Sequence, residues 1–192
     1  MDPVARTLWT VGHSTLEMEK FLRMLSAHTI AAIVDVRSIP HSRRSPWFGG
    51  DHLMVALPEA GIRYVWMPAL GGFRHPLKDS VNTGWIDPAF RGYADYMQSG
   101  EFSRALEALI RIAEEGRTAV LCAEGNPYRC HRRLIADSLT ARSVRVLHIT
   151  SLHAVQEHRM TPFAQVHGTG ITYPAPQKNA DEQQRSLTGE GS

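Results

Sequence analysis

Short apolar runs alternate along this chain with longer segments in which apolar residues recur every three or four positions. The short runs predict buried β-strands, and the periodic segments predict amphipathic helices. We expect strands over residues 7–11, 30–36, 62–67, 118–122 and 144–149. We expect helices over residues 14–28, 51–61, 88–98, 102–115, 129–141 and 151–159.

Several residues at the ends of these segments are typical helix boundaries. Ser14 and Glu17 have the spacing of a capping box, and Asp87 before Pro88 pairs an N-cap residue with a first-turn proline. Gly116 directly follows the segment 102–115, in the position where helices often end on glycine. Pro58 conflicts with the second half of the helix expected over 51–61.

The alternation of strands and helices predicts an α/β fold with three layers. A mostly parallel sheet of about five strands would carry helices on both faces, joined by right-handed crossovers. The run from Ile30 to Val36 is apolar almost throughout, as expected for a strand that is covered on both faces. We expect a single domain over residues 1–160 and a polar C-terminal tail over residues 161–192, disordered at least after Gln177.

Composition narrows the class of protein. Of the 192 residues, 43% are hydrophobic, which is ordinary for a globular protein and excludes a wholly disordered chain. No apolar run approaches the ~20 residues of a membrane span. A net charge of +2 argues against a general nucleic-acid coat, although clustered arginines still permit local anion binding. The first residues do not resemble a secretory signal, so we expect a cytoplasmic protein with reduced cysteines.

Polar and glycine-rich clusters follow directly after four of the predicted strands. Because the carboxyl ends of parallel strands share one edge of a sheet, where α/β proteins bind ligands, these clusters predict one composite site. They consist of His13 with Ser14, Asp35 with Arg37, Gly71 with Gly72, and Cys122 with Glu124.

The same blocks, in this order, resemble the signature of a known family. They comprise Val11-Gly-His-Ser14, Val34-Asp-Val-Arg37 with Pro40 and Ser42-Arg43, Leu70-Gly-Gly72, and Cys122-Ala-Glu124 with Cys130-His-Arg132. The chain resembles domain-of-unknown-function family 488 over about residues 7–150. This resemblance implies a compact α/β domain and marks these residues as its hallmarks, but it implies no reaction.

Cys122 is the first candidate for chemistry. A thiol at a strand end, close to a helix N-terminus and to the cations Arg129, His131 and Arg132, is expected to have a lowered pKa. The pattern differs from the Cys-x5-Arg loop of tyrosine phosphatases, since six residues separate Cys122 from Arg129 and Glu124 adds a negative charge. The alternative is that Cys122 is a small buried residue.

The remaining candidates have both functional and structural interpretations. Asp35 and Arg37 share one face of a strand, where they either orient a substrate or form an ion pair. Glu124 is a candidate general base or a loop ion-pair partner. The predicted catalytic residues are Cys122, Glu124, His131 and Asp35, and the predicted substrate-binding residues are His13, Arg37, Arg43, Gly71, Gly72, Arg129 and Arg132.

Three functions remain open. The first is an enzyme that acts on a small anionic or nucleotide-like substrate at the strand ends. The second is a nucleic-acid or nucleotide-binding module without catalysis, using the same arginines. The third is a metal-binding or thiol redox protein, in which the weaker alternative metal site would consist of Cys122, Cys130, His131 and His13. The sequence identifies no cofactor, no reaction and no oligomeric state.

Overall fold

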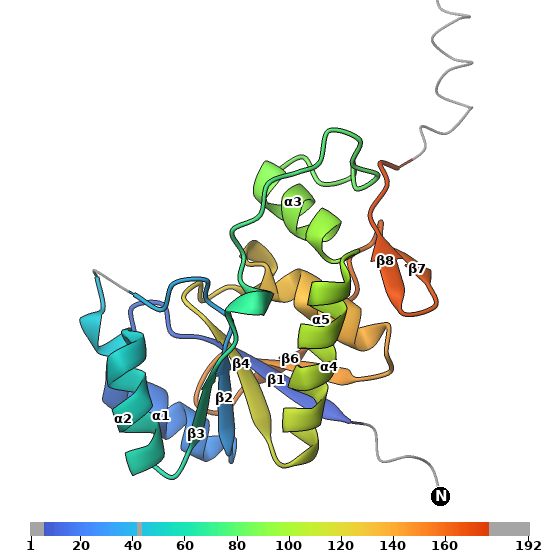
Figure 1. Ribbon diagram of the computed structural model, residues 1–192. Coiled ribbons are helices and arrows are strands. Elements are labelled where there is room, and N and C mark those ends of the chain that lie inside the picture. Colours follow the sequence, from blue (N-terminus) through green and yellow to red (C-terminus); the bar gives the residue numbers. More distant parts are fainter. Residues whose placement is uncertain (1–5, 42–43, 177–192) are drawn as a thin grey trace, which may run out of the picture.

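A twisted six-stranded sheet forms the centre of the molecule (Figure 1). The computed structural model describes residues 6–41 and 44–176. The strands lie in the order β3-β2-β4-β1-β5-β6, with the first five parallel and β6 antiparallel to β5. Their bounds are β1 (Thr7–Gly12), β2 (Ala32–Asp35), β3 (Arg63–Trp66), β4 (Thr118–Cys122), β5 (Arg145–Ile149) and β6 (Val155–Glu157).

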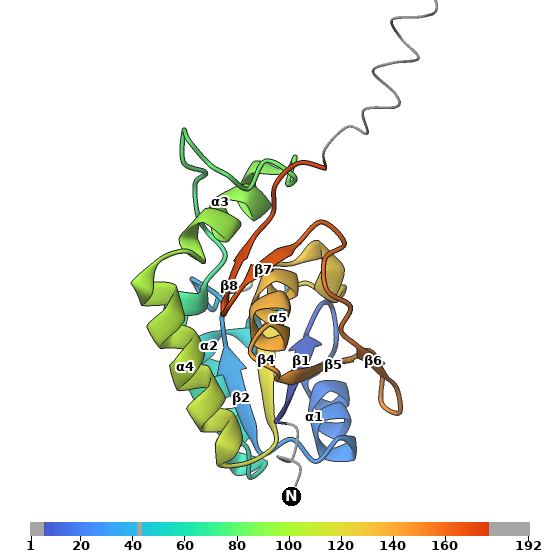
Figure 2. The same cartoon turned by 90° about the vertical axis from the view of Figure 1, so that its right-hand side faces the viewer.

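Helices cover both faces of this sheet, which confirms the predicted three-layer α/β fold (Figures 1 and 2). In β2, Ile33 packs in the cluster formed with α1 and α2, whereas Val34 packs in the cluster formed with α4 and α5. None of the helices in the described ranges has the length and apolar character needed to cross a bilayer. The helix bounds are α1 (Met18–Ala27), α2 (Gly50–Glu59), α3 (Pro88–Tyr96), α4 (Gly100–Glu114) and α5 (Arg132–Thr140).

The strand order reverses direction between β1 and β4. From β1 the chain moves outward to β2 and then β3, and after β4 it crosses to β5 on the opposite side of β1. Adjacent strands whose connections leave in opposite directions have a crevice at their carboxyl ends, and ligands of open α/β sheets bind there. The fold therefore places Gly12 and Cys122, a parallel pair at the ends of β1 and β4, at this crevice.

The start of the first helix differs from the prediction. Ser14 does not cap it: the residue has a φ of 47°, and its backbone N–H donates to the carbonyl of Ala123 at 2.8 Å. The helix begins at Met18 with Glu17 as N-cap. A backbone hydrogen bond between the loop after β1 and the loop after β4 therefore replaces the expected capping box. Asp87, in contrast, does cap α3, accepting from the N–H of Ala89.

The prediction of a helix over residues 151–159 is wrong. Thr150 and Ser151 donate to the carbonyl of Ala154, which closes a turn, and β6 then returns along β5. Arg145 pairs with Glu157 across these two strands at 2.8 Å. The outermost strand of a sheet has unpaired backbone N–H and C=O groups along its free edge. Here β6 pairs with these groups of β5, which a helix over residues 151–159 would have left unpaired.

The first part of the predicted tail packs against the domain. Short strands β7 (Gln165–His167) and β8 (Gly170–Thr172) lie beside α5 (Figure 2). Tyr173 is fully buried, and its hydroxyl donates to the carboxylate of Asp137 on α5 at 2.9 Å. Packing thus extends past residue 160 into the predicted tail, while the disorder predicted after Gln177 falls outside the described residues.

The Tyr173–Asp137 bond leads to a stability prediction. In Tyr173→Phe, one oxygen of a fully buried carboxylate loses its donor, so we expect the free energy of unfolding to fall by about 1–3 kcal/mol. Urea denaturation measures the loss. Tyr128→Phe is the matched control because its hydroxyl has only a 3.5 Å contact from Gln156, and that variant should change stability little.

Candidate functional site

Three strand ends continue side by side beyond the sheet. The N–H of His13 donates to the carbonyl of Cys122 at 3.1 Å, and the N–H of Val36 donates to the carbonyl of Leu121 at 3.1 Å. The segments that follow β1, β2 and β4 are therefore fixed to one another by backbone hydrogen bonds. Side chains from three separate parts of the sequence meet at this edge.

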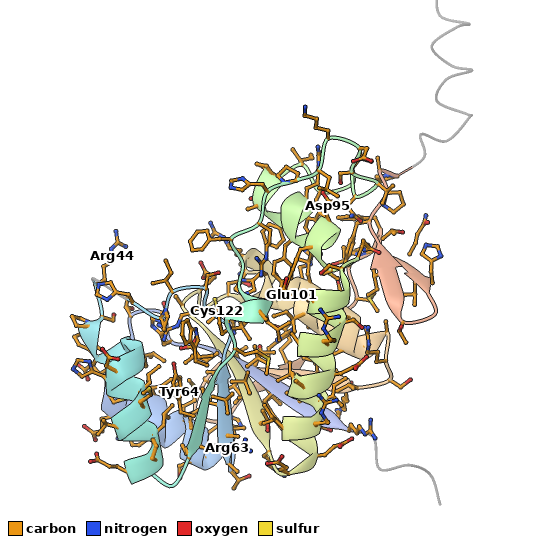
Figure 3. The ribbon with its side chains drawn as sticks, viewed as in Figure 1. Arg44, Arg63, Tyr64, Asp95, Glu101 and Cys122 are labelled. Carbon is orange, nitrogen blue, oxygen red and sulfur yellow. The ribbon has the colours of Figure 1, made fainter. Side chains whose placement is uncertain are left out.

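A cavity of about 480 Å³ opens above these strand ends. Figure 3 shows Cys122 at this end of the sheet. One wall is apolar and includes Phe73 and Phe90, and the polar groups on the other walls include Arg37, Glu124 and Arg129. The residues that line the cavity are Arg37, Ser38, Ile39, His41, Gly72, Phe73, Asp87, Ala89, Phe90, Cys122, Ala123, Glu124, Arg129, Cys130 and His131.

Two thiols and an imidazole form the floor of the cavity. The Sγ atoms of Cys122 and Cys130 and a ring nitrogen of His131 all lie within 4.8 Å of one another. His131 Nε2 lies 3.2 Å from the carbonyl oxygen of Val36, which can only accept, so this nitrogen carries the proton. Its Nδ1 faces Cys130 Sγ at 3.6 Å. We call Cys122, Cys130 and His131 the floor trio.

Gly72 is required by the packing of this trio. A Cβ at position 72 would lie 2.6 Å from His131 Nδ1. A side chain here would therefore push the imidazole out of its place beside Cys130. Gly71 has a different role, since its Cβ would meet the hydroxyl of Ser38. The two predicted glycines therefore allow close packing at the site, one against the imidazole and one against the loop after β2.

The two thiols differ in acidity. A hydrogen bond with Cys130, reinforced by burial, raises the pKa of the Cys122 thiol. The same hydrogen bond lowers the pKa of Cys130 well below its ordinary value, against the effect of burial, and His131 and Arg132 lower it further. The sequence favoured Cys122 as the more reactive thiol, whereas these contacts favour Cys130 as the thiolate.

Arg132 lies beneath the floor rather than in the cavity wall. Its side chain is 1% exposed, and it donates to the backbone carbonyl of Glu124 and, at 3.4 Å, to the hydroxyl of Thr10. Its Nε has no hydrogen-bond partner among the described residues. Gly12 makes room for this arrangement, because a Cβ there would collide with the Glu124 carbonyl and the guanidinium.

Asp35 and Arg37 form a buried ion pair. The carboxylate accepts from Arg37 Nε at 2.8 Å and from Arg37 Nη2 at 2.5 Å, and it also accepts from the hydroxyl of Tyr64 at 2.9 Å. Burial alone would lower the pKa of Arg37, but the hydrogen bonds and charge of Asp35 raise it above its ordinary value. With both oxygens engaged, Asp35 positions Arg37, so the contacts support the structural alternative for this residue.

His13 is held as a neutral imidazole. It stacks on Phe48 with ring centroids 4.2 Å apart, its Nδ1 lies 3.0 Å from the carbonyl of Ser14, and its Nε2 lies 3.3 Å from Arg37 Nη1. The carbonyl requires a proton on Nδ1, which leaves Nε2 to accept from Arg37. Burial, assisted by the charge of Arg37, lowers the pKa of His13 to about 4.

Comparison with protein families identifies the chain. The model of the family described as "Domain of unknown function DUF488" matches residues 17–139. The chain belongs to this family. The DUF488 match spans every predicted site residue except His13, which precedes it. A search of curated proteins and a search of solved structures each found no match.

Sequence reasoning missed part of the DUF488 site. Its apolar wall comes from Ile39, Phe73 and Phe90, which lie in loops or at a helix start where no periodicity marks them. His148 and His158 were also missed: they link Thr10 to Asp137 by hydrogen bonds of 2.7, 3.0 and 2.8 Å. A histidine inside the apolar strand 144–149 was the available signal. Of the predicted residues, Arg43 lies outside the described ranges.

The neutral state of His13 predicts a pH dependence of stability in this DUF488 protein. Unfolding returns the pKa of His13 from about 4 to about 6.5, so the unfolded chain binds more protons between these values. We expect the free energy of unfolding to fall as the pH drops from about 6.5 towards 4.

Comparison of variants isolates this effect. His13→Gln is expected to show a smaller fall in the free energy of unfolding between pH 7 and about 4.5 than the wild type, measured by urea denaturation at each pH. His153→Gln, at an exposed position, should keep the wild-type slope. Equal slopes for wild type and His13→Gln would show that His13 is not held neutral.

Proposed function

We propose that this protein is an enzyme that acts on a small anionic or nucleotide-like substrate in the cavity at the carboxyl ends of β1, β2 and β4. One observation carries the proposal: a single cavity of about 480 Å³ combines guanidinium groups on its walls with two thiols and an imidazole on its floor. Cavities of this size suit small molecules, and convergent polar groups in a partly apolar cavity are typical of active sites.

The arginines that line the cavity differ in how they would bind a substrate. Arg129 is exposed at the cavity wall and has no carboxylate partner within the described ranges, so it is available to an anion. Arg37 also lines the cavity, but Asp35 and His13 fix its orientation, and Asp35 offsets its charge. A planar guanidinium matches the geometry of phosphate and carboxylate oxygens. Phe73 and Phe90 offer an apolar surface against which a base or ring packs.

Glu124 is the carboxylate best placed to transfer protons. It is exposed at the cavity, and within the described part of the chain only its Oε1 is engaged, by the N–H of Asn126 at 2.9 Å. Asp35 is fully buried and saturated by Arg37 and Tyr64, so we do not retain it as a proton carrier. The floor trio supplies the sulfur and imidazole groups that would meet the substrate's reacting atoms.

Binding of simple anions tests the proposal first. Inorganic phosphate and AMP are expected to bind the full chain, measured by isothermal titration calorimetry, and Arg129→Gln should weaken both by about 10-fold or more because a charge-assisted hydrogen bond is lost. Arg111→Gln removes the same charge from the exposed end of α4 and should bind as the wild type does.

Turnover tests the catalytic part. A panel of phosphate esters and nucleotides, followed by chromatography, should contain at least one compound that the wild type converts, and Glu124→Gln should bind that compound but convert it far more slowly. Absence of both binding and turnover would contradict the proposal. Binding of single-stranded oligonucleotides alone, weakening steeply with salt, would instead indicate a nucleic-acid-binding module.

A further inference from the structure

We infer that Cys122, Cys130 and His131 form a three-ligand site for a thiophilic divalent metal of the zinc class, with a fourth coordination position open to the cavity. The donor set is two thiols and one imidazole, the ligands that zinc prefers and that magnesium and calcium do not. The site goes beyond the proposed function and stands independently of it, because it rests on the geometry of the floor trio alone.

The separations within the trio suit a tetrahedral ion. With Zn–S of ~2.3 Å and Zn–N of ~2.0 Å, two ligand atoms on a tetrahedron lie roughly 3.5–3.8 Å apart. Cys130 Sγ and His131 Nδ1 are 3.6 Å apart, and the three ligand atoms are all within 4.8 Å of one another. Small side-chain rotations are therefore enough to bring all three atoms around one ion.

The imidazole is oriented as a metal ligand requires. A ligating histidine usually donates its second ring N–H to a carbonyl or carboxylate, which fixes its tautomer. His131 meets this condition, since Nε2 donates to the Val36 carbonyl at 3.2 Å, and Nδ1, which gives up any proton when it binds a metal, lies beside Cys130 Sγ. Gly72 lies against the same Nδ1 and leaves the space that an ion needs.

His13, the fourth member of the metal site considered from sequence, is not a ligand in this arrangement. Both of its nitrogens are engaged, with the Ser14 carbonyl and with Arg37. All three members of the trio, in contrast, line the cavity. Three protein ligands with one open position are typical of catalytic zinc sites, whereas structural sites are closed by four.

The charge around the trio favours an anion at the open position. Two thiolates offset the charge of a divalent ion, so the site itself would be neutral. Arg132 then remains beneath it as a buried cation, and no carboxylate of the described residues pairs with its side chain. Its positive charge favours negative charge nearby, and would do so for a water or substrate oxygen bound to the metal.

Titration with Zn²⁺ alone tests the site. The full chain, reduced with a phosphine and stripped with a chelator, is titrated against a competing zinc dye. We expect one Zn²⁺ per chain, and loss of a ligand should weaken binding by more than about 100-fold, beyond the ~10–100-fold typical of outer-shell changes. His131→Gln is the main variant because His131 is half-buried, and His52→Gln on α2 is the matched control.

Measurements on the wild type avoid the risk that cysteine variants unfold. Bound Zn²⁺ should protect both Cys122 and Cys130 from alkylation, and Co²⁺ should give thiolate charge-transfer absorption with a tetrahedral visible spectrum. Two results would overturn the site: no Zn²⁺ binding by the reduced wild type, or unchanged binding in folded His131→Gln. Phosphate and AMP binding in metal-free buffer reports on the proposed function separately, so failure of one leaves the other standing.

Discussion

The fully buried guanidinium of Arg132 is the constraint around which the site is built. A buried cation is costly unless its protons find acceptors. Here the carbonyl of Glu124 and the hydroxyl of Thr10 accept, and Gly12 allows the close approach. Because Thr10 also bonds His148, the polar contacts continue through His158 to Asp137 on α5. The acceptor-only carboxylate of Asp137 requires a proton on Nε2 of His158, and this contact ends the chain of hydrogen bonds. Burial, assisted by the neighbouring His158, lowers the pKa of His148 to about 3, so this imidazole is a neutral link in the chain.

This constraint explains why the thiols lie where they do. Arg132 begins α5, and the loop before that helix carries Cys130 and His131 back over the end of β4. Anchoring the guanidinium under Glu124 therefore also fixes the turn that brings Cys130 to Cys122. The same anchor supplies the positive charge that favours ionised sulfur, and thiolate is the form that attacks substrates and binds metals. Fold stability and site chemistry thus depend on the same side chain.

The sequence predicts features that depend on neighbouring residues better than features that depend on residues far apart in the chain. The strand 118–122 and the cap at Asp87 depend on local pattern, and both appear as expected. The placement of polar clusters after parallel strands also led to Gly72, Cys122 and Glu124 at one cavity, because strand direction follows from the alternation of elements. Ser14 was misassigned, since the capping pattern is local while the competing hydrogen bond to Ala123 comes from a loop more than a hundred positions away. For the same reason the sequence favoured Cys122 over Cys130 as the more reactive thiol, whereas their acidities are decided by their mutual contact and by Arg132.

The three arginines near the cavity differ mainly in how their charge is balanced. The charge of Arg37 is offset by Asp35, whose carboxylate lies 2.5 Å from its guanidinium. Arg37 is therefore an oriented hydrogen-bond donor that adds little net positive charge to the cavity. Arg129 is exposed to water, which screens its charge at a distance, so it would act on an anion chiefly through direct hydrogen bonds. Arg132 is shielded from water and lacks a carboxylate partner in the described chain, so its field acts at close range in a low dielectric. The strongest preference for negative charge therefore lies at the floor of the cavity. Under the proposed function, the charge of Arg132 would draw an anion that enters past Arg129 and Arg37 towards the floor of the cavity, where the reacting groups or a bound metal would meet it.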